Sequence, residues 1–437
     1  MDRPNTLNGE KLQHIRTPIP GPRTRELTAA LRSVESRNVT YVDARFPVFW
    51  ESASGAIVTD VDENRYIDLT AGFGVANTGH SNPAVAQAIA RQAKRLMHAM
   101  GDVHPAEVKT QLLEKLALIT PGNLQKTFLA STGSEAVEAA MKTAIMATGK
   151  STFLSFRGAY HGLSLGALEV SGIEKFRDPF KSMLPCRTVF LDFPAADAND
   201  PNAARTHLAV ARKTLETNPD IAAVIIEPVQ ARGGNFVAAP GYLRALREIC
   251  TALGVLLIFD EIYTGFGRTG TMFACDADGA VPDIICIGKA MANGFPISAA
   301  VASPQVMDAW PESPGEALHT STYLGNPMAC AAAIANIGEV ERLDLPARAR
   351  ALGDALEQRL EGLRSHASVR DVRGRGLLWG IQLSDGETAA RVVKEALRAG
   401  VIVLQAGPAG DVLSITPPLV ISEQQLFAAI DVIADFL

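Results

Sequence analysis

The chain has 437 residues, of which 47% are apolar and 20% are charged, as in an ordinary folded globular protein. Its formal net charge of −6 argues against nucleic acid as a partner, and no apolar run approaches the roughly 18 residues of a membrane span. The polar N-terminus lacks the apolar region of a secretory signal, and the five cysteines are scattered without C-x-x-C spacing. We therefore expect a cytoplasmic protein with reduced thiols, no membrane partner and no metal site.

The N-terminal part of the chain predicts an arm followed by a hairpin. The first forty residues are polar and are expected to lie over another part of the protein. Residues 55–69 predict a strand, a tight polar turn and a second strand. The acidic turn Asp60–Asn64 resembles a calcium loop, but Arg65 and Ala71 stand where that loop needs Gly and Glu. A hairpin turn is the better interpretation.

Helical spacing of apolar residues begins after Pro83, and Val85, Ile89, Ala93, Leu96 and Met100 share one predicted face. Short apolar strands then alternate with helices, with strands at 127–130, 152–156, 188–191, 221–227, 255–260 and 284–287 and helices at 135–148, 203–216 and 241–253. This alternation predicts an α/β fold with a mostly parallel sheet covered on both faces. A long helix over about 326–343, strands at 377–383 and 400–404 and a C-terminal helix predict a smaller α+β domain.

Two short motifs suggest other chemistries. Gly265, Gly267 and Gly270 match the dinucleotide pattern G-x-G-x-x-G, but no helical period follows, so we reject a nicotinamide-binding fold. Residues 162–166 match the G-x-S-x-G pattern of serine hydrolases around Ser164, with Asp260 and His319 following in that order. Ser164 has no obvious oxyanion loop, so a serine hydrolase remains only a remote alternative.

A third pattern combines four weak signals in a meaningful order. Residues 131–135 (STGSE) follow a strand and open a helix with capping-box spacing, which suits a phosphate. Tyr160 lies on a loop after a strand and could stack on a flat ring. Asp260 ends an apolar strand, where parallel sheets bind ligands, and Lys289 directly follows another. A desolvated lysine has a lowered pKa and becomes a nucleophile for carbonyls, so the set suits pyridoxal phosphate (PLP).

With these residues in place, the sequence resembles the class III, or ω-type, PLP-dependent aminotransferases of fold type I. The resemblance runs from about Pro47 to the C-terminus and is closest in layout to the 4-aminobutyrate and ornithine aminotransferases. It rests on the stretches AGFGVANTGHSNP (71–83), STGSEAVEAAMK (131–142), GAYHG (158–162), EPVQARGG (227–234), FDEIYTGFGRTG (259–270), GKAMANGFPISA (288–299), TSTYLGNPMACAAA (320–333) and VRGRGLLWGIQL (372–383). It implies a large PLP-binding domain at 79–325, a C-terminal small domain at 326–437, and an N-terminal arm with part of the small domain at 1–78.

The resemblance also implies roles for the catalytic residues. Lys289 would bind the cofactor as a Schiff base and then move the proton as general base and acid. Asp260 would pair with the pyridine nitrogen and keep it protonated, so that the ring acts as an electron sink. Tyr160 would stack on one face of the ring and Ile262 on the other.

Further cofactor contacts follow in the same way. Gly133 and Ser134 would hold the phosphate, and Glu227 would lie near the ring hydroxyl. Thr322 would reach the phosphate of a partner subunit, which implies a homodimer, or a tetramer built from it; the alternative is that Thr322 caps the helix near residue 326. Several relatives carry Gln where this chain has Tyr263, so that contact to the ring hydroxyl is in doubt.

The departures from the family pattern concern the substrate. Leu163 and Ser414 stand where the 4-aminobutyrate and ornithine types have carboxylate-binding arginines, and Arg232 stands where they have Glu. We expect Arg232 to take over carboxylate binding; the alternative is that it faces solvent or pairs with a local acid. Phe73 and Leu163 would make the distal pocket apolar, which favours a donor with an apolar or aromatic tail.

The predicted function is therefore a PLP-dependent aminotransferase that works in two half-reactions. It would move an amino group from an amine or amino acid, ω-type donors included, to a 2-oxo acid by a ping-pong mechanism. A racemase or epimerase on the same fold would use the same Lys289 and Asp260, and an aminomutase is a smaller possibility. His80, His104 and His319 lie near the motifs and are expected to be structural hydrogen-bonding residues.

Overall fold

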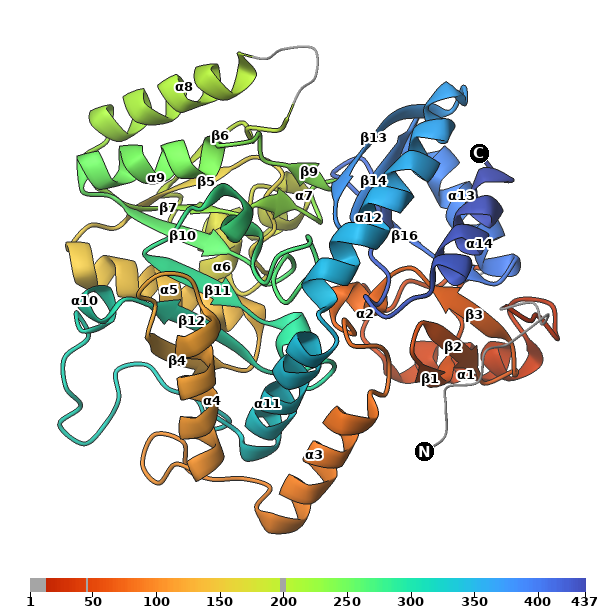
Figure 1. Cartoon of the computed structure of the whole chain (residues 1–437), viewed down its shortest axis with the longest axis horizontal. Coiled ribbons are helices and arrows are strands. Elements are labelled where there is room, and N and C mark those ends of the chain that lie inside the picture. Colours follow the sequence, from red (N-terminus) through yellow and green to blue (C-terminus); the bar gives the residue numbers. More distant parts are fainter. Residues whose placement is uncertain (1–12, 45, 197–201) are drawn as a thin grey trace.

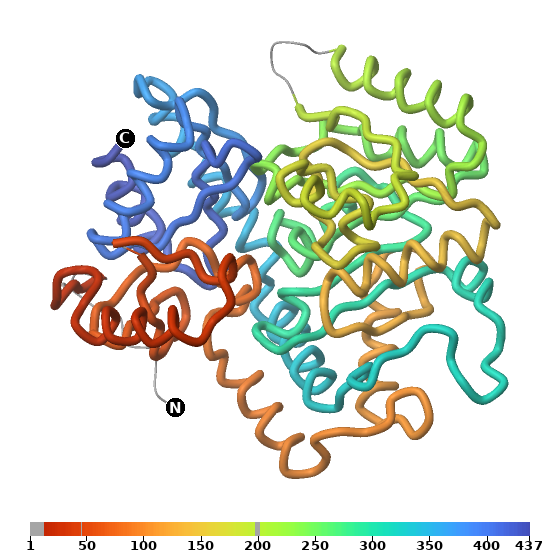
Figure 2. Tube along the Cα trace, turned by 180° about the vertical axis from the view of Figure 1, so that it is seen from behind, coloured from red at the N-terminus to blue at the C-terminus, as the bar shows by residue number. Residues whose placement is uncertain are grey.

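The computed structural model describes residues 13–44, 46–196 and 202–437. A large lobe built on one sheet lies beside a second part of the molecule, in which both ends of the chain meet (Figure 1). Seen from behind, the N-terminal and C-terminal segments again lie side by side (Figure 2). The first twelve residues of the predicted arm lie outside the described residues.

A seven-stranded sheet forms the centre of the large lobe, as the apolar strands predicted. Every strand is parallel to the others except β12, which runs antiparallel to β11 and β4. In spatial order the strands are β4 (Lys126–Ala130), β12 (Ser298–Ala302), β11 (Ile284–Ile287), β10 (Leu256–Asp260), β7 (Ile221–Ile226), β5 (Thr152–Phe156) and β6 (Thr188–Leu191). This confirms the mostly parallel α/β fold; the sequence reasoning did not place β12.

Alternate side chains of each strand face opposite helix layers. In β10, Leu257 and Phe259 belong to one apolar cluster and Ile258 to another. The first cluster includes α4 (Glu107–Ile119) and α9 (Tyr242–Leu253), with α8 (Ala203–Thr217) packed on α9. The second includes α5 (Gly133–Thr148), α6 (Leu165–Val170) and α10 (Pro304–Met307). Because both faces of the sheet are covered, the inner strands β7 and β11 are buried and apolar throughout.

A pair of helices packs beside this sheet. The predicted long helix is α11 (Pro327–Arg342), which packs against α3 (Pro83–Arg95) and α4. The predicted apolar face through Met100 was wrong beyond Arg95, because Leu96 has an extended backbone and ends α3. Leu96 and Met100 are exposed and belong to a surface loop. None of the helices within the described ranges has both the length and the apolar content needed to cross a bilayer.

The second part of the molecule joins the two ends of the chain. The sheet β1 (Trp50–Ser54), β2 (Ile57–Asp60), β3 (Arg65–Asp68) and β15 (Val401–Ile402) pairs N-terminal with C-terminal residues, with β15 parallel to β3. A second sheet has the order β13 (Val369–Arg375), β14 (Leu378–Leu383), β17 (Val412–Ile415) and β16 (Leu404–Ala406). The chain also forms the helices α1 (Pro22–Val34), α2 (Ala71–Gly74), α12 (Leu345–Glu361), α13 (Gly386–Arg398) and α14 (Glu423–Ala434). Two short strands, β8 (Val229–Gln230) and β9 (Phe236–Val237), pair with each other. The domain boundaries at 78/79 and 325/326 stay a prediction.

The predicted hairpin at 55–69 is β2 and β3, joined by a polar turn. Asp60 Oδ1 accepts hydrogen bonds from the backbone N–H groups of Asp62 (2.9 Å) and Asn64 (2.8 Å), which close the turn. Asn64 Oδ1 in turn accepts from the backbone N–H groups of Arg16 (2.8 Å) and Thr17 (3.0 Å). The described part of the N-terminal arm therefore lies over this hairpin.

A buried arginine connects the large lobe to both ends of the chain. The Arg268 side chain is fully buried, and its Nη1 donates to the carbonyls of Leu377 (2.9 Å) and Pro417 (2.6 Å). Its Nη2 donates to Asn77 Oδ1 (2.6 Å). Burial lowers the pKa of this guanidinium to about 10, yet the three acceptors keep it ordered. The G-x-G-x-x-G stretch around it is therefore a structural turn.

Candidate active site

Four polar side chains follow the carboxyl ends of parallel strands in the central sheet. Tyr160 comes after β5, Glu227 follows β7 directly, Asp260 is the last residue of β10, and Lys289 lies two residues beyond β11. β10 pairs in parallel with β7 on one side and with β11 on the other, so these strand ends lie at one edge of the sheet. Parallel sheets bind ligands at this edge.

A cavity of about 210 Å³ opens at this edge. It brings together eight of the residues predicted from the sequence, and three more that were not assigned a place in the site. Its lining is Gly133, Ser134, Tyr160, His161, Gly162, Glu227, Arg232, Asp260, Ile262, Tyr263 and Lys289. Ile262 is nearly buried and packs in the apolar cluster of α5, whereas Tyr160 is half-buried, with its ring edge-on to Phe176.

Asp260 is held by two donors deep in this cavity. Its Oδ1 accepts from the backbone N–H of Ile262 (3.0 Å), and its Oδ2 accepts from Nδ1 of His161 (2.8 Å). A carboxylate is an acceptor only, so Nδ1 of His161 carries the proton in this contact. The other ring nitrogen of His161, Nε2, is buried and has no partner among the described residues. Sequence reasoning missed His161, although its place directly after Tyr160 in GAYHG is a usable signal.

Glu227 lies beside these groups and is also buried. Its Oε1 accepts from the backbone N–H of Tyr160 (2.9 Å), which connects the end of β7 to the loop after β5. Burial raises the pKa of Glu227 to about 7; the charge of Asp260 adds to this effect, while His161 and Lys289 oppose it. Glu227 therefore titrates near neutral pH.

Lys289 points its amine into the cavity without an ion-pair or hydrogen-bond partner among the described residues. Its Nζ lies 4.4 Å from the centre of the Tyr263 ring. Burial lowers the pKa of this amine, and the charges of Asp260 and Glu227 act in the opposite direction. The Lys289 backbone has a φ of 41°, a left-handed conformation that costs roughly 1–2 kcal/mol in a residue with a side chain. Strain of this kind gathers at functional sites.

The start of α5 forms one wall of the cavity. Thr132 and Glu135 make the predicted capping box, in which Thr132 Oγ1 accepts from the Glu135 N–H (3.3 Å). The N–H groups of Gly133 and Ser134 have no acceptor among the described residues. A Cβ atom on Gly162 would collide with Ser134 Oγ, so the glycine lets the loop approach the helix end. Free N–H groups and the helix dipole suit a phosphate.

Arg232 lies on the segment between β8 and β9 and lines the cavity from the side of the C-terminal sheet. Its Nη1 donates to the carbonyl of Gln405 (3.1 Å), and its own carbonyl accepts from the Gly407 N–H (3.0 Å). Arg232 is exposed, in line with the predicted alternative that it faces solvent. Within the described ranges it pairs with no acid, so its role in carboxylate binding stays a prediction.

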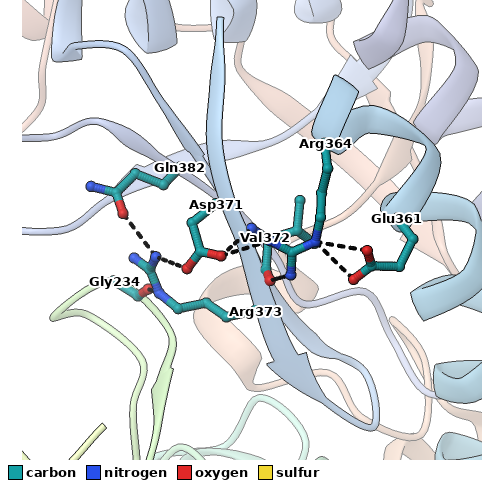
Figure 3. A network of polar contacts seen from close by, with 7 residues as sticks. All are labelled: Gly234, Glu361, Arg364, Asp371, Val372, Arg373 and Gln382. Atoms are coloured by element: carbon teal, nitrogen blue, oxygen red, sulfur yellow. Dashed lines mark hydrogen bonds and ion pairs between the residues drawn. The ribbon is translucent and has the colours of Figure 1, made fainter. Parts of the chain in front are cut away.

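A polar network on β13 holds the segment that carries Arg232 (Figure 3). Arg373 Nε donates to the Gly234 carbonyl (2.8 Å), and its Nη1 donates to Asp371 Oδ2 and to Gln382 Oε1, both at 2.8 Å. The Arg373 guanidinium also stacks over the Phe236 ring at 3.7 Å from its centre. The network continues through Asp371 to Arg364 and Glu361.

Four other residues singled out from the sequence lie outside the cavity lining. Phe73 is 68% exposed, Leu163 is 48% exposed, and Thr322 is exposed on a loop. Asn326, whose Oδ1 accepts from the Met328 N–H (3.0 Å), caps α11, so the alternative that Thr322 is the cap is wrong. Ser414 is on β17, where its hydroxyl lies 3.2 Å from Asn235 Nδ2.

The competing serine hydrolase is not assembled. Ser164 Oγ donates to Glu138 Oε1 (2.6 Å), and the histidine beside Asp260 is His161. His319 packs instead near the rings of Phe128 and Trp310. Its buried Nδ1 has no partner among the described residues, so its expected role as a hydrogen-bonding residue was wrong, whereas His80 does bond to Asp68 (2.7 Å).

Comparisons with known proteins agree with this geometry. A family model for class-III aminotransferases matches residues 39–437. An acetylornithine aminotransferase of Methanosarcina mazei is 38% identical over 399 residues, which cover 91% of this chain and 94% of that protein. The chain belongs to the class III aminotransferases.

Solved structures of aminotransferases have the same fold. An amine transaminase from an uncultivated Pseudomonas species, in its PLP-bound form, superposes with a TM-score of 0.84 at 31% identity, covering 92% of this chain and 98% of that one. An ornithine aminotransferase from Toxoplasma gondii superposes with a TM-score of 0.83 at 30% identity, covering 94% of each chain. The protein is thus a PLP-dependent aminotransferase that catalyses transamination.

The side chains of the cavity fit PLP. The Lys289 amine lacks a protein partner, the Asp260 carboxylate suits a protonated ring nitrogen, and the free N–H groups of Gly133 and Ser134 suit a phosphate. The buried Lys289 amine is the most telling of these features, because an unpaired polar group in a protein interior is costly unless a ligand satisfies it. The three features share one cavity.

We predict that Glu227 makes stability depend on pH near neutrality. Because the folded protein favours protonated Glu227, its contribution to the free energy of unfolding is full below about pH 4.5 and is lost as pH rises towards 7. Glu227→Gln should remove this loss, so the variant should gain on the order of 2–3 kcal/mol relative to wild type between pH 4.5 and 7.5. Urea unfolding of the holoenzyme at several pH values measures this, with exposed Glu216→Gln as the control. Parallel pH curves for wild type and Glu227→Gln would contradict it.

Proposed function

We propose that this aminotransferase takes an amino group from an ω-amine or amino acid and passes it to a 2-oxo acid in two separate half-reactions. The observation that carries the proposal is the Lys289 amine, unpaired and placed between Asp260, Glu227 and Tyr263 in the cavity. The names of similar proteins support the donor class, since they include an acetylornithine aminotransferase, an amine transaminase and an ornithine aminotransferase.

Each residue then has a defined task. With PLP bound, Lys289 would hold the cofactor covalently, and its amine would carry a proton during the reaction. Asp260, oriented by His161, would keep a proton on the ring nitrogen, and Tyr160 and Ile262 would lie against the ring. The cofactor would supply an electron sink for the electron pair left on the donor carbon. Gly133 and Ser134 would hold the phosphate, and Glu227 orders the loop of Tyr160.

Arg232 is proposed to bind the substrate carboxylate. It is charged, lines the cavity, has no ion-pair partner in the described ranges, and acts electrostatically on both Tyr160 and Tyr263. Ser414, bonded to Asn235, and the exposed Leu163 offer no second cation. A dicarboxylate is therefore held at one end, so pyruvate is as good an acceptor as 2-oxoglutarate. Phe73 and Leu163, which are exposed outside the cavity lining, would meet only a donor tail that extends beyond it.

A homodimer with shared sites is the proposed assembly. Exposed apolar side chains gather on two loops, which we call the apolar loop surface: Leu96, Met97, Met100, Val103, Leu318 and Tyr323. The loops are joined by Asn326 Nδ2 donating to the Met97 carbonyl (3.2 Å) and by Thr320 Oγ1 donating to Asp102 Oδ2 (2.9 Å). Exposed Thr322 lies among them, where it could reach a partner's phosphate. Large exposed apolar patches mark interfaces.

A cytoplasmic location completes the proposal. Its support is that all five cysteines are free thiols, four of them buried, as is usual in a reducing compartment.

When the holoenzyme is mixed with an amino donor in the absence of any oxo acid, we expect its visible cofactor band to disappear. The amino group should then stay on the enzyme. Lys289→Ala should lack the native band and turn over at least about 1,000-fold more slowly, because the covalent link and the proton carrier are both lost. Absorbance spectra with a panel of α-amino acids, ω-amino acids and plain amines measure this. A band that persists while the α-proton exchanges with deuterium would support a racemase instead.

Loss of the Arg232 charge should selectively weaken the binding of substrates that carry a carboxylate. Arg232→Ala should raise KM for pyruvate roughly 10- to 100-fold, as expected for a charge-assisted hydrogen bond, while Arg232→Lys should keep part of the affinity. The half-reaction with a plain amine should change by less than about threefold. Steady-state and single-turnover kinetics measure both, with exposed Arg212→Ala on α8 as the matched control. Equal losses for amine and carboxylate substrates would overturn the assignment.

Association through the apolar loop surface should be measurable. We expect sedimentation velocity to give a mass of about twice the 46.4 kDa chain, or four times in a tetramer. Met97→Asp with Met100→Asp should shift the protein towards the monomer, because two buried charges would be left unpaired. Val210→Asp, exposed on α8, is the control. A monomeric wild type at micromolar concentration would show that the surface has another partner.

A further inference from the structure

Tyr263 presents its ring face to the amine of Lys289. The Nζ atom lies 4.4 Å from the ring centre, within the range of a cation–π contact. Tyr263 itself follows β10 by three residues and lines the cavity beside Ile262. Among the described residues Lys289 makes no hydrogen bond or ion pair, and its amine lies over this ring. The ring therefore defines where the amine lies.

The space for this ring exists because residue 74 is glycine. A Cβ atom on Gly74 would lie 2.9 Å from Cε1 and 3.0 Å from Cζ of Tyr263, closer than Cβ contacts occur in proteins. Gly74 also has a φ of 74°, which a residue with a side chain adopts only under strain. The ring and the glycine are thus complementary, and the Tyr263 ring has no room to move towards α2.

The hydroxyl of Tyr263 connects the ring to both terminal segments of the chain. It donates to Thr416 Oγ1 (3.3 Å), which donates to the Thr70 carbonyl (3.4 Å). Thr416 follows β17 and Thr70 follows β3, so the contact joins the cavity to each of the two small sheets. Tyr263 also packs against an apolar cluster of Val229, Ala231 and Leu378. The ring is thus held between Gly74, the contact at its hydroxyl and this apolar cluster.

The charged groups around this pair come from several elements. Asp260 and Glu227 act on Lys289, and Arg232, Arg268 and Asp68 act on Tyr263. His161 lies next to Asp260. Burial raises the pKa of the Tyr263 hydroxyl, so the ring stays neutral near pH 7 and offers the lysine its π-face and no negative charge.

We propose that Tyr263 is a positioning residue for transamination, whose ring face holds the Lys289 amine in the cavity and favours its protonated form. This proposal rests on the proposed role of Lys289 as the cofactor-binding lysine. The aromatic face is the active feature, so Phe should replace Tyr263 well and an aliphatic residue should not.

Spectral pH titration of the holoenzyme tests the ring. The midpoint of the pH-dependent change in the visible cofactor band should move down by about 0.5–1 pH unit in Tyr263→Leu, since a neighbouring π-face no longer stabilises the positive charge. Tyr263→Phe should keep the wild-type midpoint. We expect kcat to fall roughly 10- to 100-fold in Tyr263→Leu with little change in KM, because a misplaced reacting group slows chemistry more than binding.

Two further variants keep the test decisive. Tyr263→Gln, a second replacement without a ring, should repeat the Leu result if Tyr263→Leu fails to fold, and Tyr242→Phe, buried in α9 away from the cavity, controls for loss of a buried hydroxyl. A wild-type midpoint in both ringless variants, or a shift as large in Tyr263→Phe, would overturn the proposal. A native visible band in Lys289→Ala would instead overturn the role of Lys289, so the two failures can be told apart.

Discussion

The common direction of the strands in the central sheet is the constraint on which the site depends. Because β5, β7, β10 and β11 are parallel, their carboxyl ends meet at one edge, and residues up to 129 positions apart in sequence become neighbours there. Asp260 and Lys289 follow adjacent strands, and Glu227 follows the strand on the other side of β10. An antiparallel arrangement would send alternate ends to opposite edges. The single antiparallel strand, β12, lies outside this group of four.

Burial then sets the chemistry of these groups. A carboxylate and an amine in a poorly solvated cavity both lose part of the hydration that favours their charged forms, so the pKa of Glu227 rises and that of Lys289 falls. Both shifts bring a titration towards neutral pH, which suits proton transfer. The site tolerates this burial because each group is either hydrogen-bonded, as Asp260 is to His161, or left for the cofactor.

Contacts between the large lobe and the terminal segments complete the cavity. Arg268 reaches Asn77, Leu377 and Pro417, and Tyr263 reaches Thr416, so residues directly after β10 hold both ends of the chain in place. The polar network around Arg373 likewise holds in place the segment that carries Arg232, through the Gly234 carbonyl. The side of the cavity that Arg232 lines is thus formed where the lobes meet, and Arg232 is one of the residues that depart from the pattern of the aminotransferases this chain resembles in layout.

The strands of the central sheet could be predicted because each is a short apolar run whose pattern follows from burial on both faces. The capping box at Thr132 and Glu135 and the positions of Asp260 and Lys289 at strand ends are equally local signals. The end of α3 was missed because exposed Leu96 and Met100 continue its apolar period into a loop. The sequence by itself determined the strands of the sheet other than β12, the strand ends and the type of chemistry. Only the tertiary structure decided that His161 orients Asp260, that Tyr263 faces Lys289, and that Arg232 pairs with no acid among the described residues, because these contacts join residues distant in sequence and depend on how the lobes pack.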